Sequence, residues 1–556
     1  MQKVKPVSWL MKMSKKQRLN MALLIFFNAV FSVLSILFAF AIKGIIDGAV
    51  VGEKVKLISY SVFICSIVVM QFILRVAVNG LTEHIRGKLE MQIKSYMFCN
   101  ILEKKHEKIN VYHSGELMNR LTSDVSVVSE GVTSIVPSVV SALVRLGCAV
   151  IALILLDWVF AIAFSVAGLL VFSVIGLLRG KLKGLHKKTQ ETDGKVRSFM
   201  QECIENLLAV KVFSVNDKIE KQADELQEKN FKVKMTRKNY SVVGHATYNF
   251  IFSAGYLFAL IYGGVKILGG LLSYGSLSAI LQLVNNVQVP FASLSNVVPK
   301  YYAMLASAER LMEIENIEGE PTERIKDRDA LYDKTNSIVV EDLCFSYDRD
   351  KVLSNASVRI NKGDFVLIEG ASGIGKSTLM KLMLGVYSVD SGEIYIDCND
   401  KNDPKVSLGC KTRNLFSYVP QGNMLFSGTL KDNVTFIKQD ATDAQIERAL
   451  EISCARDFID TLPQGLDTVV GENGVGLSEG QIQRIAIARA VLCNAPVILL
   501  DEATSALDED TERRVLDNLK GLNGITLVIV SHKKAAQSIC NKKLTVRNKK
   551  IFEQVL

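Results

Sequence analysis

The stretch Gly370-Ala371-Ser372-Gly373-Ile374-Gly375-Lys376-Ser377 decides the fold of the second half of the chain. It matches G-x-x-x-x-G-K-[ST], the pattern of a phosphate-binding loop. The residues before it, 365–369, are mostly apolar and β-prone, and the residues after it, 378–384, contain helix formers and no breaker. A strand, a glycine-rich loop and a helix in this order predict a nucleotide-binding domain.

The residue types of this loop suit phosphate chemistry. Its glycines allow backbone N–H groups to close around phosphate oxygens, and the N-terminus of the helix adds a favourable dipole. Lys376 can reach the outer phosphates, and Ser377 offers a hydroxyl to Mg²⁺. We expect nucleotide contacts along the whole loop and its first helical residues: Gly370, Ala371, Ser372, Gly373, Ile374, Gly375, Lys376, Ser377 and Thr378.

The composition indicates a membrane protein. Hydrophobic residues make up 49% of the 556 residues, and the mean hydropathy is +0.23, both high for a soluble protein. The net charge is +9, but surplus Lys and Arg of membrane proteins gather in cytoplasmic segments, so the charge does not predict nucleic-acid binding. The ten cysteines include no C-x-x-C pair, which favours free thiols in a reducing compartment over a metal site.

Six apolar runs in the first half predict six membrane-spanning helices. They cover residues 21–42, 57–74, 131–156, 158–178, 246–265 and 267–298, and the glycine- and serine-containing start of the last run is expected to form a turn before the sixth span. The basic residues 1–20 are expected to lie on the inner membrane face. A signal peptide is the alternative, but the apolar run that follows is too long for one. Six spans place both ends of the chain on one side, which must be the cytoplasm because the nucleotide loop follows.

Two long charged stretches, 75–130 and 179–245, separate the second span from the third and the fourth from the fifth. Both lack Pro and have a helix-like composition, which predicts helices that continue into the cytoplasm and argues against two soluble inserts. Residues 113–125 and 205–213 are plausible breaks in these helices. We expect a short crosswise helix at each break, in contact with the nucleotide domain.

Polar residues inside the predicted spans are candidates for a substrate cavity. Arg145 interrupts the third span, and an intramembrane charge is by default a functional hypothesis. It could contact substrate or pair with a polar neighbour. The sixth span contains a polar cluster that could line a cavity or form hydrogen bonds between helices: Gln282, Asn285, Asn286 and Gln288.

Two further motifs follow the phosphate loop. The apolar run 497–500 ends in Asp501 and Glu502, a Walker B pattern in which Asp501 would hold Mg²⁺ and Glu502 would activate the attacking water. Ser478 and Gly480 stand at the start of a helical stretch from 482 to 490, and they would form a second phosphate-binding surface with its N-terminus.

The order of these motifs resembles the ATP-binding cassette, and nearly the whole chain resembles a half-size, exporter-type ABC transporter. The resemblance implies a fold of two parts, an α-helical six-span membrane domain with long cytoplasmic extensions and an α/β P-loop ATP-binding cassette. The changes in composition along the chain predict the boundaries: an N-terminal interfacial segment at 1–20, a membrane domain at 21–310, a linker at 311–337 and a cassette at 338–556, which begins where the pattern becomes strand-like.

The resemblance also implies roles for single residues. Tyr347 would stack on adenine, and Ser478, Gly480, Gln481 and Asp508 would contact ATP. The implied catalytic residues are Glu502, His532 and Gln421, and the implied Mg²⁺ ligands are Ser377, Gln421 and Asp501. One departure is Glu479, which stands where the family most often has glycine.

In this family the phosphate loop of one cassette faces the Ser478-type signature of a second cassette. The resemblance therefore implies a dimer that binds ATP and Mg²⁺ between two cassettes. A homodimer is favoured because Glu502, His532, Ser478 and Gly480 are all present, and a heterodimer with a different half-transporter stays open. The implied activity is ATP-driven export of a peptide, lipid or amphipathic small molecule across a plasma or inner membrane. An importer on the same fold and a gated channel are the alternatives.

Overall fold

The computed structural model describes residues 6–321, 323–399, 404–422, 425–471, 474 and 476–556. The chain divides into two compact units, which are described separately. The membrane unit comprises residues 1–99 and 114–315, and the cassette unit comprises residues 100–113 and 316–556. Residues 100–113 thus belong to the cassette unit, although the sequence places them between two membrane spans.

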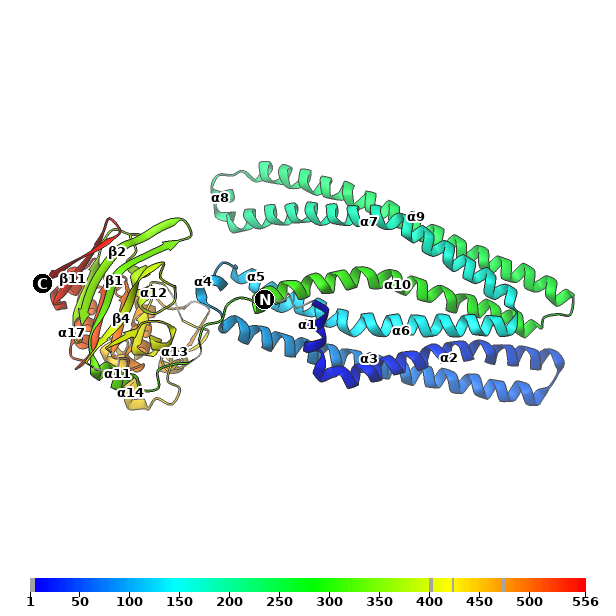
Figure 1. Cartoon of the computed structure of the whole chain (residues 1–556), viewed down its shortest axis with the longest axis horizontal. Coiled ribbons are helices and arrows are strands. Elements are labelled where there is room, and N and C mark those ends of the chain that lie inside the picture. The colour runs from blue at the N-terminus through cyan, green and yellow to red at the C-terminus, as the bar shows by residue number, and fades with distance from the viewer. Residues whose placement is uncertain (1–5, 322, 400–403, 423–424, 472–473, 475) are drawn as a thin grey trace. The chain divides into compact units, whose positions relative to one another are not determined.

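The described part of the membrane unit contains six long helices, in the order predicted for the six spans (Figure 1). Helices α7 and α9 run side by side as one hairpin, while α2, α6 and α10 pack on one another. The bounds of the six helices are α2 Arg18–Val51, α3 Lys54–Leu102, α6 Val125–Leu156, α7 Trp158–Glu205, α9 Asn216–Leu268 and α10 Tyr274–Glu315.

In the part of the chain that the structure describes, four segments are long and apolar enough to cross a membrane. These segments are Lys15–Val51, Lys54–Leu102, Ser114–Leu156 and Asn216–Leu268, and Trp158–Gly168 is a shorter apolar stretch at the start of α7. Helix α3 has 49 residues and α9 has 53. Both are longer than a bilayer crossing requires, so the charged stretches do continue as helices.

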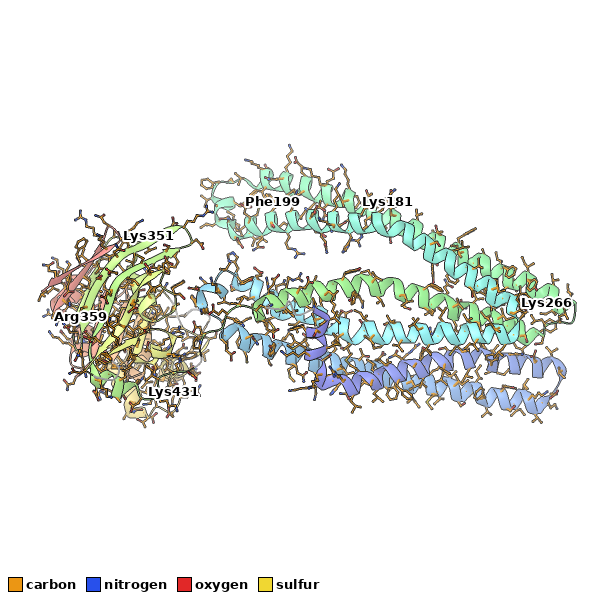
Figure 2. All side chains as sticks on the ribbon, in the orientation of Figure 1. Lys181, Phe199, Lys266, Lys351, Arg359 and Lys431 are labelled. Carbon is orange, nitrogen blue, oxygen red and sulfur yellow. The ribbon has the colours of Figure 1, made fainter. Side chains whose placement is uncertain are left out.

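The carboxylate of Asp157 closes the turn between α6 and α7, and we call its contacts with Val159 and Lys266 the clasp. Asp157 caps α7 by accepting a hydrogen bond from Val159 N at 3.0 Å. Its second oxygen accepts from Lys266 Nζ at 2.6 Å, and Lys266 lies at the end of α9 (Figure 2). The clasp therefore holds three helices together at this end of the unit.

The expectation of a separate crosswise helix at 113–125 is wrong. The short helix α4 (His106–Ile109) precedes this stretch, and α5 (Ser114–Asn119) continues through a π-helical turn, Arg120–Asp124, directly into α6. The turn is anchored to α10. Arg120 donates to Glu313 and to the Arg310 carbonyl, and Asp124 accepts from Ser307 and Arg310. These long-range contacts keep the backbone helical where the sequence suggested a break. At 205–213 the short helix α8 (Leu207–Val212) forms where we expected one.

Helix α1 (Pro6–Met13) is held by the end of α10. The ring of Trp9 is only 2% exposed, and its Nε1 donates to Glu315. Tyr96 donates to the other oxygen of Glu315 at 2.5 Å. Trp9 therefore packs within the unit, while Val7, Met11 and Leu19 of the same segment are exposed, and its place on the membrane face stays a prediction.

The cassette unit contains two main sheets. The first has six strands in the order β12-β11-β3-β10-β9-β6, parallel except for β12 at one edge. The second has four antiparallel strands in the order β2-β1-β4-β5. Their bounds are β1 Thr335–Tyr347, β2 Asp350–Asn361, β3 Phe365–Glu369, β4 Ser391–Cys398, β5 Lys405–Ser407, β6 Phe416–Val419, β9 Val497–Asp501, β10 Thr526–Val530, β11 Lys542–Arg547 and β12 Lys550–Val555.

The core of the cassette explains why one edge carries the chemistry. Apolar residues from both sheets pack on Leu379, Met380 and Met383 of α12 (Lys376–Met383). Strands β9 and β10 are buried along their whole length, as their uninterrupted apolar runs require. Because β3, β9 and β10 are parallel neighbours, their carboxyl ends meet at one edge, the usual place for a ligand in such a sheet.

A second, mostly helical part of the cassette has its own apolar core. It contains α13 (Leu430–Val434), α14 (Asp443–Ile452), α15 (Arg456–Ile459) and α16 (Glu479–Leu492). Helix α16 also contacts β6, so the helical part is joined to the edge of the six-stranded sheet.

Candidate active site

The phosphate loop leaves β3 and enters α12 through glycines that no other residue could replace without strain. Gly370 has φ 154° and Gly375 has φ 112°. A Cβ atom on Gly370 would lie 2.7 Å from the Val546 carbonyl oxygen, and one on Gly375 would lie 2.6 Å from Val352 Cγ1. Both the backbone angle and the space therefore require glycine.

Replacing Gly375 with Ala is expected to weaken nucleotide binding at least tenfold, because the loop must open to admit the methyl group. Gly409→Ala is the matched control, since Gly409 is extended (φ 177°) and a Cβ atom there meets nothing within 4 Å. Equilibrium binding of a fluorescent nucleotide measures the effect. Equal affinity of the two variants would contradict the role given to the loop.

Lys376 lies inside the loop that it serves. Its side chain is buried, and Nζ donates to the Gly370 carbonyl at 2.7 Å and to the Ala371 carbonyl at 3.2 Å. The same nitrogen lies 3.3 Å from His532 Nε2. His532 follows β10, so two neighbouring strands bring together the loop lysine and the histidine that the sequence singled out. A phosphate at this point would meet a cation that is already positioned.

Asp501, at the end of β9, is 1% exposed and meets a hydroxyl on each side. Ser377 donates to Oδ1 at 2.8 Å, and Tyr418 donates to Oδ2 at 3.0 Å. Burial raises the pKa of Asp501, and the two hydrogen bonds oppose that rise. A cation beside the carboxylate would remove the cost of its burial. One hydroxyl and one carboxylate fit Mg²⁺, which usually takes few protein oxygens and completes its shell with phosphate and water.

Glu502 and Gln421 form a pair beside Asp501. Gln421 Nε2 donates to Glu502 Oε2 at 2.7 Å. Glu502 has φ 52°, an uncommon angle for a residue with a side chain, and its N–H donates to the Val530 carbonyl at 3.1 Å. The turn after β9 therefore fixes the direction of this carboxylate. Backbone strain of this kind is concentrated at functional sites.

Tyr347 ends β1 close to the phosphate loop helix. Its hydroxyl lies 3.4 Å from Thr378 Oγ1, and the residue is 37% exposed. The ring packs edge-on against Phe345 and Tyr387, with centroid distances of 4.8 Å and 5.2 Å. The residue is thus near the site, with part of its ring free to stack on a base.

The remaining predicted site residues lie elsewhere. Ser478 caps α16 and forms reciprocal hydrogen bonds with Gln481, at 3.3 Å and 2.8 Å. Gly480 backs onto the Ala506 carbonyl, which a Cβ atom would approach to 2.9 Å. Asp508 caps α17 (Glu509–Lys520) by accepting from Thr511 N, and this hydrogen bond lowers the pKa of Asp508. Among the described residues, no hydrogen bond or ion pair joins these four residues to residues 370–378.

Sequence reasoning missed two groups in this region. Tyr418 on β6 binds Asp501, and no local motif announces that contact. Lys533 follows His532 and donates to the carbonyls of Thr504 and Leu507, at 3.0 Å and 2.7 Å. Glu512 is fully buried beside Lys533 and accepts from the Thr504 hydroxyl at 2.7 Å. The only sequence signal for Glu512 is that a charged residue stands on the apolar, core-facing side of the amphipathic helix in which it lies.

Comparison with known proteins places this geometry in a family. Models for the ABC transporter transmembrane region and for the ABC transporter domain match residues 21–291 and 353–505. An "ATP-dependent lipid A-core flippase" of Syntrophus aciditrophicus (strain SB) is 31% identical over 424 residues, 76% of this chain and 69% of the relative. The chain belongs to the ABC transporter family. A flippase of the same name from Idiomarina loihiensis is 29% identical over 535 residues, 94% of this chain and 90% of the relative.

A solved structure supports the fold of this ABC transporter. The chain is similar to a bacterial Atm1-family ABC exporter with ATP bound, with a TM-score of 0.81, 20% identity, and coverage of 98% and 95% of the two chains. The predicted fold class is thereby confirmed, a helical membrane domain followed by a cassette. The protein is a multi-pass membrane protein that couples ATP hydrolysis to transport.

Proposed function

We propose that this ABC transporter is an exporter that moves a lipid or lipid-like amphiphile with an anionic headgroup out of the inner leaflet, as a dimer. The cassette lies in the cytoplasm, and each ATP is bound by Mg²⁺ and by residues of both cassettes. Two relatives that are lipid A-core flippases by name support a lipid. The similarity to an exporter supports the direction.

The observation that carries the dimer is the separation between Ser478 and the phosphate loop. Ser478, Gly480 and Gln481 form their hydrogen bonds within α16 and none, among the described residues, with residues 370–378. The N-terminus of α16, whose Ser478 and Gln481 N–H groups are used in the cap, would attract the phosphates of a nucleotide held by a second copy through its dipole. Apolar side chains on and after α8 also stand exposed, with Leu208 78% and Phe213 73% accessible. A second copy would cover them.

Each residue of the site has a separate proposed role in hydrolysis. Lys376 neutralises charge that builds up on the transferred phosphoryl group. Glu502 accepts a proton from the attacking water, and the amide of Gln421 holds this carboxylate in place. His532, next to the ammonium of Lys376, orients the outer phosphate. Mg²⁺, held by Ser377 and Asp501 with Gln421 nearby, would further stabilise the phosphate charge.

Arg145 carries the argument for an anionic cargo. Its Nη2 donates to Ser35 Oγ at 3.3 Å, while its Nε is buried without a hydrogen-bond partner. Within the described residues, no carboxylate forms an ion pair with it. An unpaired cation at this depth is costly, and an anionic headgroup would remove that cost. In the polar cluster, buried Asn286 donates to the carbonyls of Ser35 and Gln282, at 3.3 Å and 3.4 Å, and so links helices.

Replacing Arg145 with Gln is expected to raise the concentration of anionic lipid needed for half-maximal stimulation of ATP hydrolysis about tenfold, since the variant loses the charge that attracts the headgroup. Hydrolysis is measured in nanodiscs in which an anionic lipid is titrated into a zwitterionic one. Arg145→Lys is the control and should keep most of the response. An unchanged titration for Arg145→Gln would exclude Arg145 from headgroup binding.

Transport itself is tested in vesicles of known sidedness. ATP added on the cassette side should move a fluorescent anionic lipid away from that leaflet, and Glu502→Gln should abolish the movement. Movement toward the cassette side would instead support the importer alternative. ATP hydrolysis without any lipid movement would remove the lipid from the proposal.

A further inference from the structure

The loop between α12 and β4 carries one aromatic ring that contacts three others. The ring of Tyr387 lies edge-on to that of Tyr347, with a centroid distance of 5.2 Å and an interplanar angle of 90°. It also packs on Phe345 at 5.7 Å and on His106 at 5.9 Å. Tyr347 and Phe345 end β1, whereas His106 begins α4. Tyr387 is therefore the only one of these rings that contacts both β1 and α4 in the part of the chain that the structure describes.

The segment that carries His106 is tied to the cassette by further contacts. Ser388 N, the residue after Tyr387, donates to Glu107 Oε2 at 3.2 Å. Lys105 N donates to the Glu318 carbonyl at 3.1 Å, and its side chain forms an ion pair with Glu318 at 2.6 Å. We call residues 103–109 the coupling segment. It lies between the end of α3 at Leu102 and the start of α5 at Ser114.

These contacts connect the base-binding region to a segment that continues into two helices of the membrane unit. Phe345 is 4% exposed and anchors the cluster, while Tyr347 is 37% exposed. A base that stacks on Tyr347 fixes the tilt of this ring. Because edge-to-face pairs depend on ring tilt, Tyr387 must keep the same orientation, and His106 packs on the other side of it.

We propose that Tyr387 is a positioning residue that orients the base-binding ring of Tyr347. Through its contact with His106, Tyr387 also transmits the presence of a bound base to the coupling segment. The proposal rests on the proposed function, because it assumes that Tyr347 stacks on the base and that ATP drives lipid movement. It assigns to Tyr387 an effect on ATP binding and to His106 an effect on coupling alone.

The first experiment measures the KM for ATP of the full-length protein in lipid nanodiscs. Tyr387→Leu is expected to raise the KM about fivefold with little change in kcat, because Tyr347 loses the ring that orients it while Glu502 and Lys376 stay in place. Tyr387→Phe keeps the ring but loses the hydroxyl that interacts with the Tyr347 side chain, so it should raise the KM less than Tyr387→Leu does. A merely structural role would lower kcat and the thermal unfolding midpoint together and leave the KM unchanged.

The second experiment measures lipid-stimulated hydrolysis. His106→Ala is expected to halve the stimulation, at least, and to leave the KM for ATP within about twofold. His113→Ala is the matched control, since His113 is exposed on the same connection. The double variant Tyr387→Leu, His106→Ala should lose no more lipid stimulation than the single variant with the larger loss, because the effects of contacting residues in one path are not additive.

The outcomes separate the relay from the proposed function. If Tyr347→Leu leaves the KM unchanged, the base site itself is misassigned. If Tyr347→Leu raises the KM but Tyr387→Leu does not, or if His106→Ala couples normally, the relay is overturned and the proposed function stands. If the wild type moves no lipid, the KM values for ATP of the Tyr387 variants still decide the role of Tyr387. The His106→Ala substitution leaves the cassette core intact, so its lipid-stimulated hydrolysis decides the proposal even if Tyr387→Leu folds poorly.

Discussion

Glu502→Gln is expected to lower ATP hydrolysis at least a hundredfold while ATP affinity stays within about threefold. Removing a general base typically costs a factor of about 10² to 10⁴. The amide has the same shape, and its oxygen can still accept the hydrogen bond from Gln421, which Glu502 accepts at 2.7 Å. The neighbouring Asp501 and Ser377 are untouched, so the phosphate and Mg²⁺ site should persist. The measurement is phosphate release alongside equilibrium ATP binding.

Glu393→Gln provides a matched control for this charge change, because Glu393 is exposed on β4. Its hydrolysis rate should equal that of the wild type. If Glu502→Gln keeps more than about a tenth of the wild-type rate, another group activates the water. His532 would then be the first residue to test, since it lies beside Lys376.

Two inactive variants are expected to restore activity when they are mixed, which is the second large effect. Lys376→Ala disables the phosphate loop, and Ser478→Arg blocks the N-terminus of α16. In a mixed dimer with shared sites, one site has both defects and the other has none. Random mixing makes about half of the dimers mixed, so hydrolysis should recover to about a quarter of the wild-type rate if the sites act independently.

The same experiment separates the two possible arrangements of the site. If each chain completed its own site, every site in the mixture would keep one defect, and activity would stay at the level of the separate variants. ATP retained by the mixture after gel filtration is a second readout, because it requires only one closed site. Ser478→Thr is the control, since Thr can also cap α16 and accept from Gln481 N.

Much of this architecture could be predicted from local patterns. The glycine spacing of 370–377, the apolar strand before Asp501, and the six apolar runs all record burial or backbone angles within a few neighbouring residues. Such patterns can be recognised in the sequence alone, because a strand buried on both faces must be apolar throughout and a bilayer-spanning helix must be apolar over its length. They predicted the two-part fold and the order of the helices and motifs.

Contacts between distant segments were invisible at that level. The sequence suggested a break at 113–125, but Arg120 and Asp124 bind α10 and keep the backbone helical. Nothing in the sequence indicated that Trp9 would donate a hydrogen bond to Glu315, 306 positions away. Neither partner carries a local signature, because a hydrogen bond across the fold requires only one polar atom at the right place.

The sequence by itself determined which residues can bind a nucleotide and which segments can enter a membrane. The tertiary structure decided which of them meet. It placed Ser377 and Tyr418 on Asp501, gave Glu502 a left-handed backbone angle, and put His106 against Tyr387. The physical reason is that residue type and spacing limit local conformation, whereas proximity between strands, loops and the coupling segment arises only when the sheet forms and its core packs.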